Sequence, residues 1–179
     1  MNPMVKKVWR LPALSVILFL TALVLMGCIP PKARGFSMYL LADEIPATEL
    51  LPVDLKDLEL QEEPILPSDD IITYSWARHE IELTAEGYER IQQLFTLPAK
   101  VHGIPFVVCI GTDRVYAGAF WTPVSSISFD GVVICQSFDP DKRIIRIGLG
   151  YPCPEAFTAK DPRSDQRIRQ SLEAAGKLK

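Results

Sequence analysis

Residues 106–121, FVVCIGTDRVYAGAFW, decide the fold. The first five, Phe106–Ile110, would be apolar on both faces of an extended chain, which is typical of a strand inside a sheet. Gly111–Arg114 can form a tight turn, and Val115–Trp121 returns as the partner strand. Gly118 within the return strand indicates a bulge or a close backbone approach. The stretch therefore predicts an antiparallel hairpin at the centre of a sheet.

Further strands are expected on both sides of this hairpin, where short aliphatic and aromatic runs are bounded by turn residues. Asp130–Gly131 is a strong turn dipeptide, so the runs before and after it are expected to flank a turn there. The additional strands are predicted over residues 36–42, 71–74, 80–83, 127–129, 132–135 and 143–149.

Two helices complete the pattern. Thr84 is a good N-cap for a helix over residues 85–95, and Ser164 or Asp165 can cap a second helix over residues 166–175. The predicted fold class is therefore α+β. We expect a small, mostly antiparallel sheet with one central helix and a C-terminal helix, behind an N-terminal signal or anchor segment.

Residues 1–27 are typical of a secretory signal peptide. They hold three basic residues and no acidic one, and an apolar run over residues 11–26 follows the basic part. The run ends in Leu-Met-Gly-Cys at residues 25–28, which resembles the lipobox of bacterial lipoproteins. The resemblance implies cleavage between Gly27 and Cys28, and attachment of acyl chains such as palmitate to Cys28.

Two other interpretations of this segment stay open, namely a retained transmembrane helix and a signal that is cleaved without lipidation. The apolar run is short for a membrane span, which needs about 20 residues. In all three cases the bulk of the chain lies outside the cytoplasmic membrane, so we expect the extracytoplasmic face of the cell membrane or the outer membrane. Ile29, rather than Asp, follows the cysteine, which fits outer-membrane sorting in a Gram-negative cell.

The chain is expected to divide into a signal peptide (1–27), a tether (28–35) and a single extracytoplasmic domain (36–179) whose first part, residues 36–70, is Pro-rich, acidic and partly irregular. The full chain has 19 Lys and Arg against 22 Asp and Glu, and loss of the three bases in the signal takes its net charge from −3 to −6. Nucleic-acid-binding proteins usually carry a basic face, so no nucleic acid partner is expected.

The sequence contains no familiar motif for metal, cofactor or nucleophilic chemistry. His79 and His102 belong to no ligand set, and no two cysteines have the spacing of a redox or zinc motif. Cys109 lies in an apolar run and is expected to be a buried small hydrophobe, which leaves Cys135 and Cys153 as the preferred disulfide pair. We therefore predict no metal, no cofactor and no enzymatic activity.

The stretch AFWTPVSS at residues 119–126 is a candidate for partner binding. Two large aromatic side chains run into a proline and two hydroxyl groups, and aromatic residues in such a setting can anchor a partner protein. The same side chains could instead fill the end of a small core, so both interpretations stay open. The candidate partner-binding residues are Phe120, Trp121, Pro123, Ser125 and Ser126.

Two other stretches resemble the extracytoplasmic head subdomain of SecD, the protein-export subunit. They are EPILPSDDI at residues 63–71, and residues 80–118, in which EIELTAEG opens a helix that leads to the hairpin. The resemblance implies a compact α+β binding head without catalysis. The chain departs from that family in lacking a bundle of membrane spans and in its 121–126 segment and C-terminal helix, which argues against proton-driven export. It is otherwise like small uncharacterised prokaryotic lipoproteins.

Together these features predict a lipid-anchored cell-envelope protein that acts as a non-catalytic binding or assembly module. Its partners would be the membrane, through the N-terminal lipid, and another envelope protein. The alternative is an extracytoplasmic, hydrolase-like enzyme in which folding brings carboxylates together, for example those of Asp69, Asp70 and Glu82.

Overall fold

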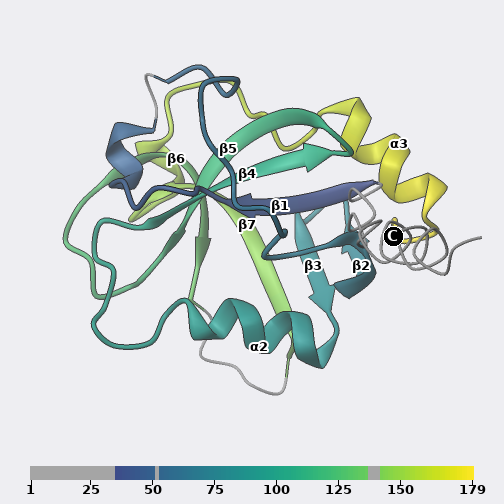
Figure 1. Ribbon diagram of the computed structural model, residues 1–179, viewed down its shortest axis with the longest axis horizontal. Coiled ribbons are helices and arrows are strands. Elements are labelled where there is room, and N and C mark those ends of the chain that lie inside the picture. Colours follow the sequence, from purple (N-terminus) through teal and green to yellow (C-terminus); the bar gives the residue numbers. More distant parts are fainter. Residues whose placement is uncertain (1–34, 51–52, 137–141) are drawn as a thin grey trace, which may run out of the picture. The chain divides into compact units, whose positions relative to one another are not determined.

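The computed structural model describes residues 35–50, 53–136 and 142–179. The predicted signal peptide, Gly27, Cys28 and the tether up to residue 34 lie outside the described residues. The described part is a mixed α/β fold with one seven-stranded sheet in the order β1-β4-β5-β6-β7-β3-β2 (Figure 1). The strands are β1 (Phe36–Leu40), β2 (Ile71–Ser75), β3 (Glu80–Leu83), β4 (Ile104–Ile110), β5 (Asp113–Trp121), β6 (Phe129–Cys135) and β7 (Ile144–Tyr151).

The predicted central hairpin is confirmed. β4 and β5 pair antiparallel, and β1 flanks β4 on its other side, so β4 lies inside the sheet. Its two faces are buried in different hydrophobic clusters, Phe106 and Val108 in one and Val107 and Cys109 in the other. Gly118 also has the expected close approach: a Cβ atom added there would lie 2.7 Å from the backbone oxygen of Val132 on β6. The absence of a side chain at Gly118 therefore lets β5 and β6 come together.

Both helices form where their caps predict. α2 (Ala85–Gln93) begins after Thr84, whose side-chain oxygen accepts a hydrogen bond from the Gly87 amide at 3.1 Å. α3 (Gln166–Ala174) begins after Asp165, whose carboxylate accepts from the Arg167 amide at 2.8 Å. Within the described residues, neither helix is long and apolar enough to cross a membrane.

The sheet is larger than the small one expected, and it is curled. β1 and β2 stand at opposite ends of the strand order, yet the rings of Phe36 and Tyr74 lie 6.1 Å apart. All seven strands contribute to one large hydrophobic cluster on the inner side of this curl. The buried residues of α2 (Tyr88 and Ile91) and of α3 (Ile168 and Leu172) complete the same cluster.

Short segments of the chain cover the outer strands of the sheet. Met38 of β1 exchanges backbone hydrogen bonds with Leu66 at 2.9 and 3.2 Å. On β2, the Tyr74 amide donates to the Lys177 carbonyl at 2.7 Å, and the Lys179 amide donates to the Tyr74 carbonyl at 2.9 Å. The backbone groups at the middle of both outer strands are therefore paired within the chain.

The acidic, Pro-rich stretch that follows β1 is irregular in its described part and lies over the outer side of the sheet. It contains two short 3-10 helices, η1 (Ala47–Glu49) and η2 (Ser68–Asp70). Leu66 forms an isolated bridge to Met38 of β1, and Leu60 forms one to Leu41, directly after β1. Its leucines at 50 and 58 are buried in a second hydrophobic cluster with Val107 and Cys109 of β4. These leucines explain how a charged segment stays attached to the sheet.

One strand pairing departs from the mostly antiparallel expectation. β5 and β6 run parallel, from Gly118 opposite Val132 to Trp121 opposite Cys135. Only residues 122–128 connect the two strands, whereas parallel neighbours usually need a crossover of a dozen or more residues. The short connection is closed by aromatic stacking, since the rings of Trp121 and Phe129 lie 5.0 Å apart and 13° from parallel.

The predicted turn at Asp130–Gly131 is wrong, because both residues lie inside β6. A Cβ atom added at Gly131 would lie 2.4 Å from the ring of Phe129, so the glycine makes room for that ring. The Asp130 carboxylate accepts hydrogen bonds from the backbone amide and the hydroxyl group of Thr158, at 2.7 and 2.5 Å. Close ring packing and this contact, rather than a turn, account for the dipeptide.

The stack of Trp121 on Phe129 leads to a prediction about stability. Trp121→Ala removes a fully buried ring and is expected to lower the free energy of unfolding by about 3–5 kcal/mol. Val124→Ala, in the same connection but 70% exposed, should change it by less than about 0.5 kcal/mol. Urea unfolding curves of the two variants measure both values. Equal stability of the two variants would contradict the role given to Trp121.

Candidate functional site

The two aromatic residues expected to bind a partner belong to the hydrophobic core. Phe120 and Trp121 are 1% and 0% exposed. The Phe120 ring lies 5.0 Å from that of Phe106, while the Trp121 ring packs against those of Phe129 and Tyr151. The alternative interpretation of these residues as core is confirmed, and neither ring is accessible to a partner in this structure.

The rest of the 119–126 stretch divides into buried and exposed positions. Ser125 is buried, and its hydroxyl group donates to the Val101 carbonyl at 2.7 Å. The Tyr151 hydroxyl group donates to the carbonyls of Pro123 and Ser125, at 3.2 and 3.0 Å. Ser125 therefore has a structural contact, whereas the side chains of Pro123 and Ser126 are exposed.

Two loops joined by the Ser125–Val101 hydrogen bond expose large apolar side chains. We call residues 94–103 and 122–128 together the loop pair. Leu97 is 90% exposed and Val124 is 70% exposed, the highest values among the exposed large hydrophobic residues of the described chain. Val124 lies inside the 119–126 stretch but is not among the residues predicted to bind a partner, and Leu97 lies outside every stretch singled out from the sequence. A single leucine or valine beside a proline gives no signal of exposure.

The three carboxylates of the alternative enzyme hypothesis have separate surroundings. The Asp70 carboxylate forms an ion pair with Arg90 and accepts a hydrogen bond from the Thr84 hydroxyl group. The Glu82 carboxylate accepts from the Thr73 hydroxyl group at 3.0 Å, and Asp69 is exposed. None of the three lines the hollow described below. Among the described residues, no group of three or more His, Cys, Asp or Glu side chains could hold a metal ion.

The expected disulfide between Cys135 and Cys153 is not formed. Both are exposed free thiols, and the antiparallel pairing of Phe129 with Tyr151 puts the two cysteines at opposite ends of the β6–β7 ladder. The β6–β7 pairing therefore does not place the two cysteines opposite each other, whereas a disulfide needs Cα atoms within about 7 Å. Cys109 is buried as expected, and burial raises the pKa of its thiol to about 11.

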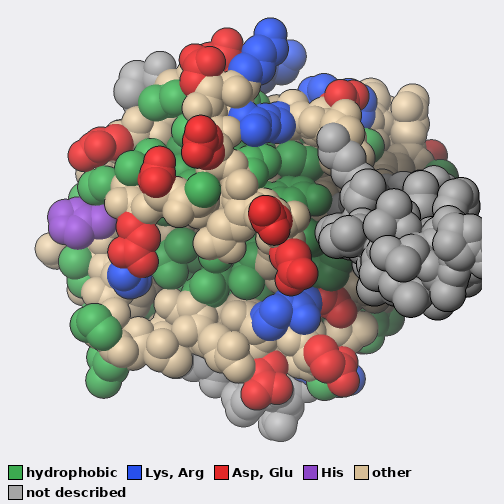
Figure 2. Space-filling model, in the orientation of Figure 1, with side chains coloured by type: hydrophobic (Ala, Val, Ile, Leu, Met, Phe, Trp, Pro, Cys, Tyr) green, Lys and Arg blue, Asp and Glu red, His purple; other side chains and the backbone are tan. Residues whose placement is uncertain are grey.

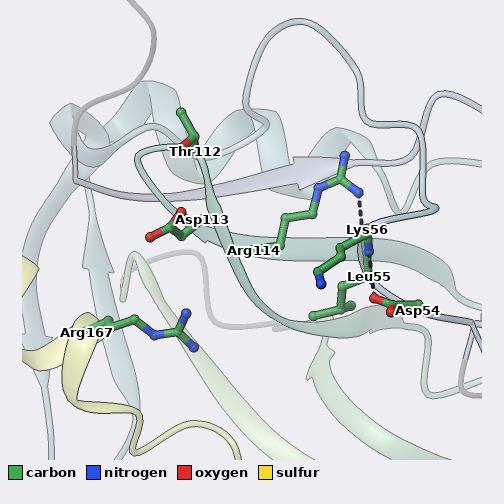
Figure 3. A pocket seen from close by; sticks show the side chains of 7 residues that line it. All are labelled: Asp54, Leu55, Lys56, Thr112, Asp113, Arg114 and Arg167. Carbon is green, nitrogen blue, oxygen red and sulfur yellow. Dashed lines mark hydrogen bonds between the residues drawn. The ribbon is translucent and has the colours of Figure 1, made fainter.

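A charged hollow of about 640 Å³ lies between the loop at residues 54–56, the β4–β5 turn and the start of α3 (Figure 3). Arg167 points toward it from α3, and Lys56 points toward it from the opposite side. Sequence reasoning missed this site because its parts come from three distant segments without a common motif. The lining residues are Asp54, Leu55, Lys56, Thr112, Asp113, Arg114 and Arg167.

Two of the cationic side chains that line the hollow are fixed in place by hydrogen bonds within the protein. The Arg114 guanidinium donates to the Leu55 carbonyl, which ties the 54–56 loop to β5. The Arg167 guanidinium forms a two-point ion pair with Asp165, at 3.0 and 2.7 Å. Both side chains are thereby oriented in advance, which reduces the entropy lost when they bind an anion.

A second cluster of titratable groups surrounds the turn between β2 and β3. His79 has a left-handed backbone φ of 50°, and its Nδ1 lies 3.2 Å from the Tyr74 hydroxyl oxygen. Burial, and then the positive charge of Arg163, lower the pKa of His79; Arg146 adds to this effect, and Asp161 partly opposes it. The imidazole is therefore neutral near pH 7. Its internal partners favour a structural role.

No family model matches this chain, and neither the curated proteins nor the solved structures include a match to it. The function of this chain is therefore inferred from the residues and the geometry described above.

The environment of His79 predicts that stability falls in mild acid. Because the pKa of His79 is below its usual 6.5 in the folded state, the unfolded chain binds the proton first as the pH falls. The stabilisation is complete above pH 6.5 and is lost as the pH drops below that value. Urea unfolding at pH 8 and pH 5.5 measures the loss.

His79→Asn should reduce the difference in stability between these two pH values, since asparagine tolerates a left-handed backbone and does not titrate. His102→Asn provides the control, because His102 is an exposed loop residue. The assignment fails if the His79 variant keeps the full pH dependence or if the His102 variant loses it.

Proposed function

We propose that this chain is a lipid-anchored cell-envelope protein that binds an envelope partner through the loop pair, without catalysis. The observation that carries the proposal is the exposure of Leu97 and Val124 on two loops tied together by the Ser125–Val101 hydrogen bond. Loops placed on a scaffold of secondary structure often carry binding residues, and these two loops present their apolar side chains to the solvent.

The likeness of residues 25–28 to a lipobox supports the lipid anchor, with acylation at Cys28 after cleavage at Gly27. The likeness of residues 63–71 and 80–118 to the SecD head supports a binding role rather than catalysis. The proposed location is the extracytoplasmic face of the cell membrane or outer membrane.

The geometry of the β4–β5 hairpin separates the two proposed functions in space. The Gly35 carbonyl accepts a hydrogen bond from the Gly111 amide at 2.9 Å, so the chain enters the domain beside the β4–β5 turn. The loop pair precedes β4 and follows β5, at the other end of the same hairpin. Seven residues of strand put these ends roughly 23 Å apart, so the point where the chain enters the domain lies away from the loop pair.

The alternative enzyme hypothesis requires carboxylates that converge in one cavity. The Asp70 and Glu82 carboxylates have separate hydrogen-bond partners, and acidic side chains are spread over the face shown in Figure 2 rather than gathered around one depression. These observations favour the binding proposal.

Site-specific crosslinking in native membranes tests the loop pair. A photoreactive side chain at position 97 or 124 is expected to crosslink a protein partner. The same group at position 72, an exposed isoleucine of β2, provides the control and should crosslink little. Equal crosslinking at all three positions, or none at 97 and 124, would contradict a specific interface at the loop pair.

The lipid anchor is tested by mass spectrometry of the membrane-extracted protein. The wild-type chain should begin at Cys28 and carry acyl chains, whereas Cys28→Ala should lack both the cleavage and the added mass. Cys153→Ala, which removes an exposed thiol elsewhere, should be processed like the wild type. A wild-type chain that is uncleaved and unacylated, like the Cys28 variant, would overturn the anchor.

A further inference from the structure

We propose that the charged hollow contacts the phosphates of anionic lipid headgroups, and that this contact sets which end of the domain faces the bilayer. The inference rests on the lipid anchor proposed above. It adds a second membrane contact, made by the folded domain itself through Lys56, Arg114 and Arg167.

The hollow lies next to the point where the chain enters the domain. Gly111, which binds the Gly35 carbonyl, directly precedes Thr112 on the rim of the hollow. On the other side, a Cβ atom added at Gly35 would lie 3.3 Å from the Ser171 hydroxyl oxygen on α3. Ser171 is four residues after Arg167 and therefore lies one helical turn from it, on the same face.

The length of the tether keeps this end of the domain close to the lipid. Gly35 is the seventh residue after Cys28 in the sequence, and a fully extended chain over these seven steps spans at most about 25 Å. The end that carries Gly35 and the hollow can therefore reach the headgroups, whereas the loop pair at the far end of the β4–β5 hairpin points to the partner side.

The cationic side chains that line the hollow have N–H donors that could bind a phosphate. The described structure gives Lys56 no partner for its ammonium group, and Asp165 occupies only the Nε and Nη2 atoms of Arg167. Arg114 uses Nη1 for the Leu55 carbonyl and retains Nη2. Guanidinium and ammonium groups from three separate segments form the kind of donor set that binds phosphate oxygens.

The overall charge limits what this contact can do. The domain that remains after signal removal is acidic, with a net charge of −6, so an anionic surface repels it as a whole. Asp54 and Asp113 also line the hollow and offset part of its positive charge. The contact therefore orients a domain that the lipid already holds, and it does not recruit the protein to the membrane.

The test uses the full-length, membrane-extracted protein in vesicles of 70% phosphatidylcholine and 30% phosphatidylglycerol. A photoreactive group at position 112 should crosslink lipid, and the same group at position 124 should not. Lys56→Gln combined with Arg167→Gln should lower the yield at position 112 several-fold, as should vesicles of phosphatidylcholine alone or 0.5 M salt. Arg169→Gln, on the same helix but outside the hollow, is the matched control.

Sedimentation with the vesicles separates this inference from the proposed anchor. If the wild-type protein does not sediment, the anchor has failed. If it sediments but position 112 gives no lipid crosslink, or the double variant crosslinks like the wild type with unchanged circular dichroism, the headgroup contact is overturned. Binding of inorganic phosphate to the wild type without vesicles, abolished by Arg167→Gln, would also overturn it, in favour of a free anion as the ligand.

Discussion

The parallel pairing of β5 with β6, which joins the two parts of the sheet, is stabilised by the stacking of Trp121 on Phe129. β6 lies parallel to β5 after a connection of only seven residues, and the stacked rings hold the chain where it folds back. β7, β3 and β2 lie beyond β6 in the strand order, so the β5–β6 pairing joins them to the central hairpin. Gly103 belongs to the same arrangement, because a Cβ atom there would lie 2.5 Å from the Trp121 ring. This buried aromatic contact thus stabilises the step that joins the two parts of the sheet.

The parts of the fold that could be predicted from the sequence are those set by local chemistry. The β4–β5 hairpin follows from an apolar run and a glycine turn, and both helices follow from side-chain caps at Thr84 and Asp165. The parallel pairing of β5 with β6 could not be predicted, because it depends on contacts that appear only when the chain folds back. The turn predicted at Asp130–Gly131 was wrong for the same reason, because Gly131 makes room for the Phe129 ring and does not form a turn.

Functional residues were harder to predict than structural ones. The same side chain can anchor a partner or fill a core, and only its packing decides, as Trp121 illustrates. The register of β6 and β7 separates Cys135 from Cys153, which spacing along the chain could not reveal. The charged hollow is assembled from three segments more than 50 residues apart, so no short motif indicates it.

The pairing of the outer strands has a consequence for self-association. Exposed strand edges are templates on which other copies add by β-pairing, and this is a common start of aggregation. Leu66 occupies the middle of the β1 edge, and Lys177 and Lys179 occupy the corresponding part of the β2 edge. The curled sheet therefore offers little free backbone for pairing between copies, even where many copies are crowded together on one surface.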